Sequence, residues 1–346
     1  IPHAIIYNVS IWESIFINHQ GMAKGDVFSL LQINDHNKVE RKGTYVSLRN
    51  ITVENSSNRL PAVNVTAFFN KHALFEVLSS TFRNNSAALV VDVFNVNQMY
   101  NFSEAPNVVI YNNTFTENFN GEHPENSVPA IFFARGKYTV TSCRFYNNKA
   151  GKSPFSAVVT ISESSKVTFS DCYFENHQTV SSATQFYAIG QSSVSFIGKN
   201  IFNISALNAG QAVFLRIPFH ATSGVVLNKH FEVLCPQGFV LNFQKTCKVF
   251  KREINCTYIY MYITCVECPS ETYTLKRAHL IYNRSNNIQC KQCPTGGNCI
   301  NGIVKAKPNF WGYKTNTSIT FAHCPPGYCC DSSNCNSYDS CHGNRT

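Results

Sequence analysis

The stretch Val167-Thr-Phe-Ser-Asp-Cys-Tyr-Phe-Glu-Asn176 decides the fold, because its pattern recurs along the chain. Apolar residues stand at its first, third and eighth positions, a small or polar residue at the sixth and Asn at the tenth. The preceding copy runs from Tyr138 to Asn147. The third-position residues that mark the seven copies are Ile11, Leu48, Val77, Ile110, Val140, Phe169 and Phe196. A period of roughly 30 residues is typical of a solenoid.

Each copy has the signature of β-strands. Apolar residues alternate with period two, β-branched and aromatic residues dominate, and Asn, Ser and Gly interrupt the runs. A second apolar run lies between the copies, as in residues 88–91 and 157–160. Two or three strands per repeat, stacked coil on coil, predict an all-β, right-handed parallel β-helix of about seven coils. A β-sandwich is the alternative, but sandwich strands do not reproduce one side-chain pattern seven times.

The repeat register predicts three columns inside this solenoid. Cys143 and Cys172 hold the same place in consecutive coils, about 4.8 Å apart, so we expect a disulfide there, with two stacked buried thiols as the alternative. One internal stack is expected from Phe82, Phe115, Phe145, Phe174 and Phe202. A ladder of side-chain amides at one corner is expected from Asn55, Asn84, Asn147 and Asn176.

The composition suggests a secreted glycoprotein. Only 14% of the 346 residues are charged, which is well below the usual quarter. The net charge is +9, but no basic run accompanies it, so nucleic-acid binding is not expected and attraction to glycosaminoglycans is a minor option. Twelve N-glycosylation sequons are present, at Asn8, Asn50, Asn55, Asn64, Asn84, Asn101, Asn112, Asn203, Asn255, Asn283, Asn316 and Asn344.

The cysteines divide the chain into residues 1–230, the parallel β-helix, and residues 231–346, a disulfide-stapled domain that we expect to continue beyond the chain end. Paired Cys-x-x-Cys spacings such as Cys265-Val-Glu-Cys268 would suggest zinc in a cytosolic protein, but the sequons favour disulfides. Thirteen of the fifteen cysteines lie in the second part: Cys235, Cys247, Cys256, Cys265, Cys268, Cys290, Cys293, Cys299, Cys324, Cys329, Cys330, Cys335 and Cys341.

Catalytic and metal-binding patterns are missing from the sequence. β-Helix lyases and hydrolases need clustered carboxylates, and no two carboxylates recur in one column of adjacent coils. Isolated polar residues near the strand runs, among them Asp92, Thr160, Asp171, Arg135 and Arg216, are interpreted as solvated wall positions. No nucleophile elbow, phosphate loop or metal-ligand His spacing occurs. We therefore expect no enzyme activity, no catalytic residues, no metal and no cofactor.

Two segments resemble known families. The Phe-x-Asn-Asn repeat resembles right-handed β-helix proteins of the pectate-lyase-like superfamily, and Cys290-Lys-Gln-Cys293-Pro-Thr-Gly-Gly-Asn-Cys299 resembles ephrin-receptor-like and growth-factor-like modules. The stretches Lys307 to Tyr313, Cys324 to Cys330 and Ser337 to Thr346 are similar to large invertebrate cell-surface proteins. In those proteins a β-helix ectodomain leads through a cysteine-rich collar to membrane spans.

That resemblance implies an architecture and no chemistry. It also implies that the partner of Cys341 lies beyond the chain, since the matching stretch continues to further cysteines. The cysteine count is odd, so one collar cysteine is expected to be unpaired or paired outside the chain, and Cys341 is the predicted one.

The predicted function is that of a non-enzymatic structural or recognition module of an extracellular or cell-surface glycoprotein. A rigid β-helix would present a protein or glycan ligand site, carry N-linked glycans and contact a membrane only through segments absent from this chain. Two alternatives are a protein that binds or degrades polysaccharide and a subunit of an extracellular filament. A shallow groove lined by acidic and aromatic residues would favour the polysaccharide alternative. Exposed strand edges in the first coil would allow self-association.

Overall fold

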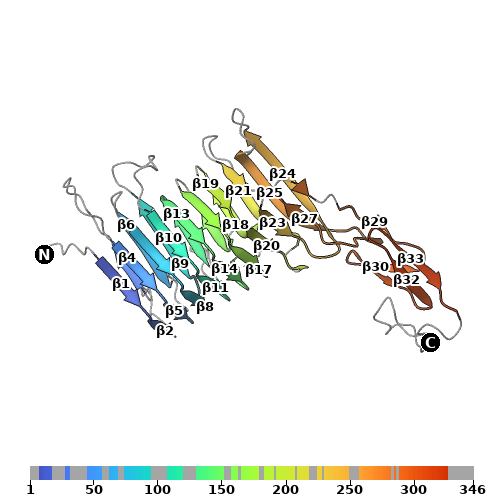
Figure 1. Cartoon of the computed structure of the whole chain (residues 1–346), viewed down its shortest axis with the longest axis horizontal. Helices are drawn as coiled ribbons and strands as arrows, with labels where there is room; N and C mark the ends of the chain where they lie inside the picture. Colours follow the sequence, from blue (N-terminus) through green and yellow to red (C-terminus); the bar gives the residue numbers. More distant parts are fainter. Residues whose placement is uncertain are drawn as a thin grey trace.

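The computed structural model confirms an all-β parallel solenoid followed by a disulfide-rich segment (Figure 1). It describes residues 8–17, 28–31, 45–56, 62–68, 74–94, 107–119, 130–151, 157–162, 165–178, 183–190, 192–206, 209–217, 224–227, 230–248, 257–281, 284–285 and 288–325. The sequence also predicts an insertion from Asp92 to Pro106 and a polar loop from Asn118 to Pro129, and most of both segments lies outside these residues.

Three columns of parallel strands form the solenoid, and each coil contributes one strand to each column, except that the last coil adds none to the third column within the described residues. The first column is β1 (Asn8–Trp12), β4 (Tyr45–Arg49), β7 (Leu74–Leu78), β10 (Asn107–Tyr111), β13 (Lys137–Thr141), β16 (Lys166–Ser170), β19 (Ser193–Ile197) and β22 (Val225–Leu227). The second is β2 (Ile15–Ile17), β5 (Thr52–Glu54), β8 (Thr81–Arg83), β11 (Thr114–Thr116), β14 (Arg144–Tyr146), β17 (Tyr173–Glu175), β20 (Asn200–Asn203) and β23 (Phe231–Leu234). The third is β3 (Phe28–Leu31), β6 (Val63–Phe68), β9 (Leu89–Phe94), β12 (Ile131–Ala134), β15 (Val159–Ile161), β18 (Ala183–Ile189) and β21 (Ala212–Ile217).

The second column carries the predicted aromatic stack. Its middle residues point inward because side chains alternate along a strand, and every ring of the stack is fully buried. The centroid distances from Phe82 through Phe115, Phe145 and Phe174 to Phe202 are 5.0, 4.9, 4.6 and 4.5 Å, with the ring planes nearly parallel. The register read from the sequence is therefore confirmed.

Two sharp corners flank β5, β8, β11, β14 and β17 of the second column. A single residue with positive φ turns the chain at each of these corners, which favours Asn, Asp and Gly because they tolerate the left-handed region. One corner follows the first column at Asn50, Ser79, Asn112, Ser142, Asp171 and Gly198. The other follows the second column at Asn55, Asn84, Glu117, Asn147 and Asn176. The predicted asparagines do share a corner, and the Asn84 Nδ2 donates to the Asn55 Oδ1 over 2.7 Å.

The main ladder lies one residue further along than predicted. At Asn118 the amide Nδ2 donates to the Phe82 carbonyl at 2.9 Å and to the Asn148 Oδ1 at 2.9 Å, while its Oδ1 accepts from the Asn85 backbone at 3.1 Å. Asn85 and Asn148 are likewise buried. In this copy of the sequence repeat the tenth position is Glu117, and the Asn stands one residue later, at Asn118. Asn118 is in register with this buried ladder, and Glu117 occupies the corner.

His177 ends the described part of the ladder and should make the fold sensitive to acid. Its Nδ1 accepts the Asn148 backbone N–H at 3.2 Å, and burial lowers the pKa of His177 from 6.5 to about 3. As the pH falls, the unfolded chain therefore binds a proton at His177 near pH 6.5, whereas the folded chain does so only near pH 3. The free energy of unfolding that is present above pH 6.5 is lost as the pH falls from 6.5 toward 3. In denaturant titrations over this range, His177→Asn should lose less stability than the native chain, because an amide can accept the same bond without titrating. Equal losses would contradict this assignment.

The predicted disulfide between Cys143 and Cys172 is wrong. Both are buried free thiols in the same column. The Cys143 Sγ donates to the Ile110 carbonyl at 3.6 Å, and the Cys172 Sγ donates to the Val140 carbonyl at 3.6 Å. Stacked side chains of parallel strands point the same way, which does not give the near-perpendicular dihedral that a disulfide needs. Burial, followed by the neighbouring Cys143, raises the pKa of Cys172, so its thiol stays protonated.

Antiparallel strands close the C-terminal end of the solenoid. The hairpin of β24 (Phe239–Lys248) and β25 (Thr257–Glu267) pairs through β25 with β21 and β22, and β27 (His279–Ile281) pairs with β23. Met261, Ile263 and Leu280 are fully buried in the same core as the phenylalanine stack. The core thus crosses the domain boundary expected at residue 230, and the cap comes from the second part of the chain.

Beyond the cap, the disulfide-rich segment has a small core of its own, made by Tyr273, Val304 and Ile319. Gly238 and Gly302 meet backbone to backbone, and a Cβ on Gly302 would lie 2.1 Å from the Gly238 carbonyl oxygen, so neither tolerates a side chain. The remaining strands are β26 (Thr272–Tyr273), β28 (Arg284–Ser285), β29 (Lys291–Gln292), β30 (Gly297–Ile300), β31 (Ile303–Ala306), β32 (Phe310–Lys314) and β33 (Ile319–His323).

Seven of the predicted collar cysteines are disulfide-bonded. Three bridges join Cys235 to Cys265, Cys268 to Cys290 and Cys293 to Cys299. Cys324 is also disulfide-bonded. The side chain of Cys247 and the residues Cys256, Cys329, Cys330, Cys335 and Cys341 lie outside the described part, so the prediction for Cys341 stays a prediction.

Candidate functional site

An open groove runs along the outer wall of the second column. Its volume is about 980 Å³, and it reaches from the β11 coil to the β20 coil. Strand alternation places its side chains: Phe145 and Phe174 point into the core, so their neighbours point outward. The lining residues are Asn112, Asn113, Thr114, Ser142, Arg144, Tyr146, Asp171, Cys172, Tyr173, Glu175, Lys199 and Ile201.

Asp171 is held as an ionised acceptor at the corner of the groove. The Ser170 hydroxyl donates to its carboxylate at 2.6 Å and the Lys199 backbone N–H donates at 2.7 Å, and both bonds lower the pKa of Asp171. Gly198 makes this approach possible, since it has a φ of +64° and a Cβ there would lie 2.5 Å from the carboxylate. The carboxylate is therefore a fixed hydrogen-bond acceptor.

Glu175 is tied through Asn203 to the cap. The Asn203 Nδ2 donates to the Glu175 Oε1 at 2.7 Å, and the Arg277 guanidinium donates to the Asn203 Oδ1 at 2.7 Å. Burial, followed by the charge of Glu175, raises the pKa of Tyr173, so its hydroxyl stays protonated. These contacts fix the groove wall before any ligand arrives.

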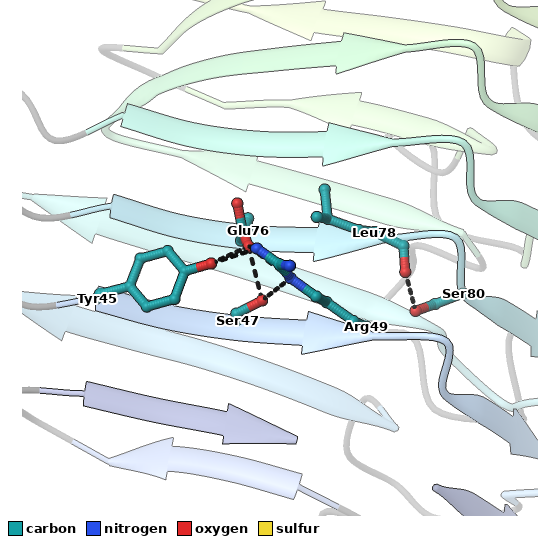
Figure 2. A network of polar contacts seen from close by, with 6 residues as sticks. All are labelled: Tyr45, Ser47, Arg49, Glu76, Leu78 and Ser80. Carbon is teal, nitrogen blue, oxygen red and sulfur yellow. Dashed lines mark hydrogen bonds and ion pairs between the residues drawn. The ribbon is translucent and has the colours of Figure 1, made fainter. Parts of the chain in front are cut away.

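A second polar cluster lies on the first column, around Glu76 (Figure 2). Its Oε1 accepts from Tyr45, from Ser47 at 2.7 Å and from the Arg49 Nε at 2.9 Å. Burial by itself raises the pKa of Glu76, but the bonds from Tyr45, Ser47 and Arg49 outweigh it, so the pKa is lowered. The carboxylate stays ionised at neutral pH with its donors in place, an arrangement that stabilises the junction of β4 and β7.

Sequence reasoning missed both clusters because it searched for acidic residues that recur in a column. The anchors Leu48 and Val77 already placed Ser47 opposite Glu76, and the register confirms that pairing. The interpretation of isolated polar residues as solvated was also wrong for two of them: Arg216 is fully buried and Thr160 is 3% exposed. Asp171 and Arg135 are exposed, whereas the side chain of Asp92 is not described.

The sequon asparagines differ in their exposure to solvent. Asn50, Asn84, Asn112 and Asn316 are exposed, and Asn55 and Asn203 are half-buried. Asn8 and Asn64 begin or lie within strands, but their side chains are not described. The other predicted sites, Asn101, Asn255, Asn283 and Asn344, fall outside the described residues.

Comparison of the chain with protein-family models, with curated proteins and with solved structures found no match. Within the described ranges, no cluster of three or more His, Cys, Asp or Glu side chains could hold a metal ion. Nor do these ranges contain a helix of the length and hydropathy that a membrane span requires. The disulfides are consistent with a secreted or extracellular protein.

Proposed function

We propose that this chain is a non-enzymatic recognition module of an extracellular glycoprotein, and that the groove on the second column binds its ligand. The observation that carries the proposal is an open groove of polar and aromatic side chains on a wall of hydrogen-bonded strands. A site that is formed in advance binds without the entropic cost of ordering loops.

The state of Asp171 does not fit the role of a general acid. A general acid needs a pKa raised toward neutrality, and the pKa of Asp171 is lowered. Glu175 is engaged by Asn203. Both groups are arranged to accept hydrogen bonds from a ligand, as an adhesive surface requires.

The distribution of sequons supports an accessible groove. The corner residues beside β14 and β17 are Ser142, Asp171, Asn147 and Asn176, and none of them begins a sequon. Asn50 and Asn84 are exposed at corners of earlier coils, Asn112 lines one end of the groove, and the Asn203 Nδ2 is held by Glu175. N-linked glycans on Asn50 and Asn84 would therefore leave the groove uncovered.

Binding to cells tests this function. The labelled full chain, produced with its glycans, should bind the surface of cells that express it, and Arg144→Ala should reduce that binding by about tenfold or more. Lys137→Ala removes an exposed cation from the first-column wall and should leave binding unchanged. Equal binding by both variants would overturn the groove as the ligand site, and release of reducing ends from added polysaccharide would overturn the non-enzymatic assignment.

The N-terminal coil favours a second candidate function, which is self-association. Trp12, Ile15 and Ile17 are 64%, 69% and 50% exposed on the wall of β1 and β2, where the next coil carries Arg49, Thr52 and Glu54. Exposed apolar residues gathered on one wall favour contact with another chain. Sedimentation should show a concentration-dependent oligomer that Ile15→Asp disperses and Thr52→Asp does not. A monomer at every concentration would exclude this candidate.

A further inference from the structure

We propose that the ligand of the groove is a neutral, linear oligosaccharide that lies across successive coils; this inference rests on the function proposed above. The groove crosses four stacked strands of the second column, β11, β14, β17 and β20, which form its floor. Neighbouring coils are spaced by about 4.8 Å. A pyranose ring has a similar length, so consecutive sugars can meet equivalent positions on consecutive coils.

Two tyrosines supply the apolar part of such a site. Tyr146 and Tyr173 project from the adjacent strands β14 and β17 on the outer wall. Tyr146 is 36% exposed. The faces of a sugar ring carry C–H groups that pack on an aromatic ring, while the Tyr173 hydroxyl is held by hydrogen bonds to Asn203 and Glu175.

The charged groups of the lining supply directional hydrogen bonds, and their charges sum to zero. Arg144 and Lys199 are two cations, and Asp171 and Glu175 are two carboxylates. Sugar hydroxyls both donate and accept, so they match this alternation. Because the two carboxylates offset the two cations, the groove offers a polyanion no net positive charge, unlike the whole chain with its net charge of +9.

Calorimetry with defined oligosaccharides tests the ligand class. The probes are cellohexaose, laminarihexaose and chitohexaose as neutral chains and a heparin-derived hexasaccharide as the anionic chain. We expect the full chain to bind at least one neutral probe more tightly than the heparin fragment. Tyr146→Ala should weaken that binding by about tenfold or more, and Tyr313→Ala, which removes an exposed tyrosine from the disulfide-rich segment, should not.

Three outcomes overturn the inference: exclusive binding of the heparin fragment, binding of no oligosaccharide, and neutral binding that Tyr146→Ala leaves intact. If Arg144→Ala still reduces cell binding in any of these cases, the proposed function stands and only the sugar ligand is wrong. If Arg144→Ala leaves cell binding unchanged while Tyr146→Ala weakens the binding of a neutral oligosaccharide, the proposed cell-surface function is wrong and the sugar site stands. Because Tyr146 is on the surface, the unfolding temperature of Tyr146→Ala should match the native value and so separate binding from folding.

Discussion

Replacing Phe145 with Ala will lower the free energy of unfolding by about 3–5 kcal/mol. Phe145 lies in the middle of the stack, with ring centroids 4.9 Å from Phe115 and 4.6 Å from Phe174, and it is fully buried. Backbone hydrogen bonds to the coils on either side prevent the wall from collapsing into the space left behind. Denaturant titration measures the loss.

Tyr146→Ala is the matched control for this variant. It removes an aromatic ring from the next residue of the same strand, but on the outer wall, and it should cost less than about 1 kcal/mol. If the two variants lost the same stability, the assignment of inner and outer faces would be wrong. If Phe145→Ala does not fold, Phe145→Leu keeps most of the volume and should show a smaller loss of the same sign.

Removal of the Cys235–Cys265 bridge should cost about 2–5 kcal/mol. This bridge closes a separation of 30 residues, and both cysteines are fully buried in the main core. It links the end of β23 to the cap strand β25, so its loss should detach the cap and expose the last coil. The double variant Cys235→Ala/Cys265→Ala, compared by denaturation and limited proteolysis, measures both effects.

The Cys293–Cys299 bridge provides the contrast. It closes only six residues and lies in the small core of the disulfide-rich segment. Its removal should cost less and leave proteolysis of the cap unchanged. Equal losses from the two double variants would contradict the role assigned to the cap.

The repeat predicted the solenoid well because it reports on side chains that face the core. Phe82 to Phe202 must stack when strands stack, so one sequence column becomes one spatial column. The cap was not predictable in this way. β25 alternates as other strands do, but nothing local shows that it returns antiparallel to β21 and β22.

The candidate site was less predictable than the fold. The groove depends on outward residues such as Tyr146 and Tyr173, whose identity core packing does not dictate. The wrong prediction of a Cys143–Cys172 bridge shows a second limit of the repeat. Equal register brought the cysteines together, but equal direction of their side chains left them as two free thiols. Register thus predicts proximity, and bonding also needs orientation.

The cap also determines how tension would enter the molecule from its C-terminal side. β25 holds β21 and β22, β27 holds β23, and the Cys235–Cys265 bridge connects β23 covalently with β25. A pull on the disulfide-rich segment would therefore reach all three columns together rather than one strand alone. The strands that close the C-terminal end of the solenoid thus also tie it, column by column, to the segment that follows (Figure 1).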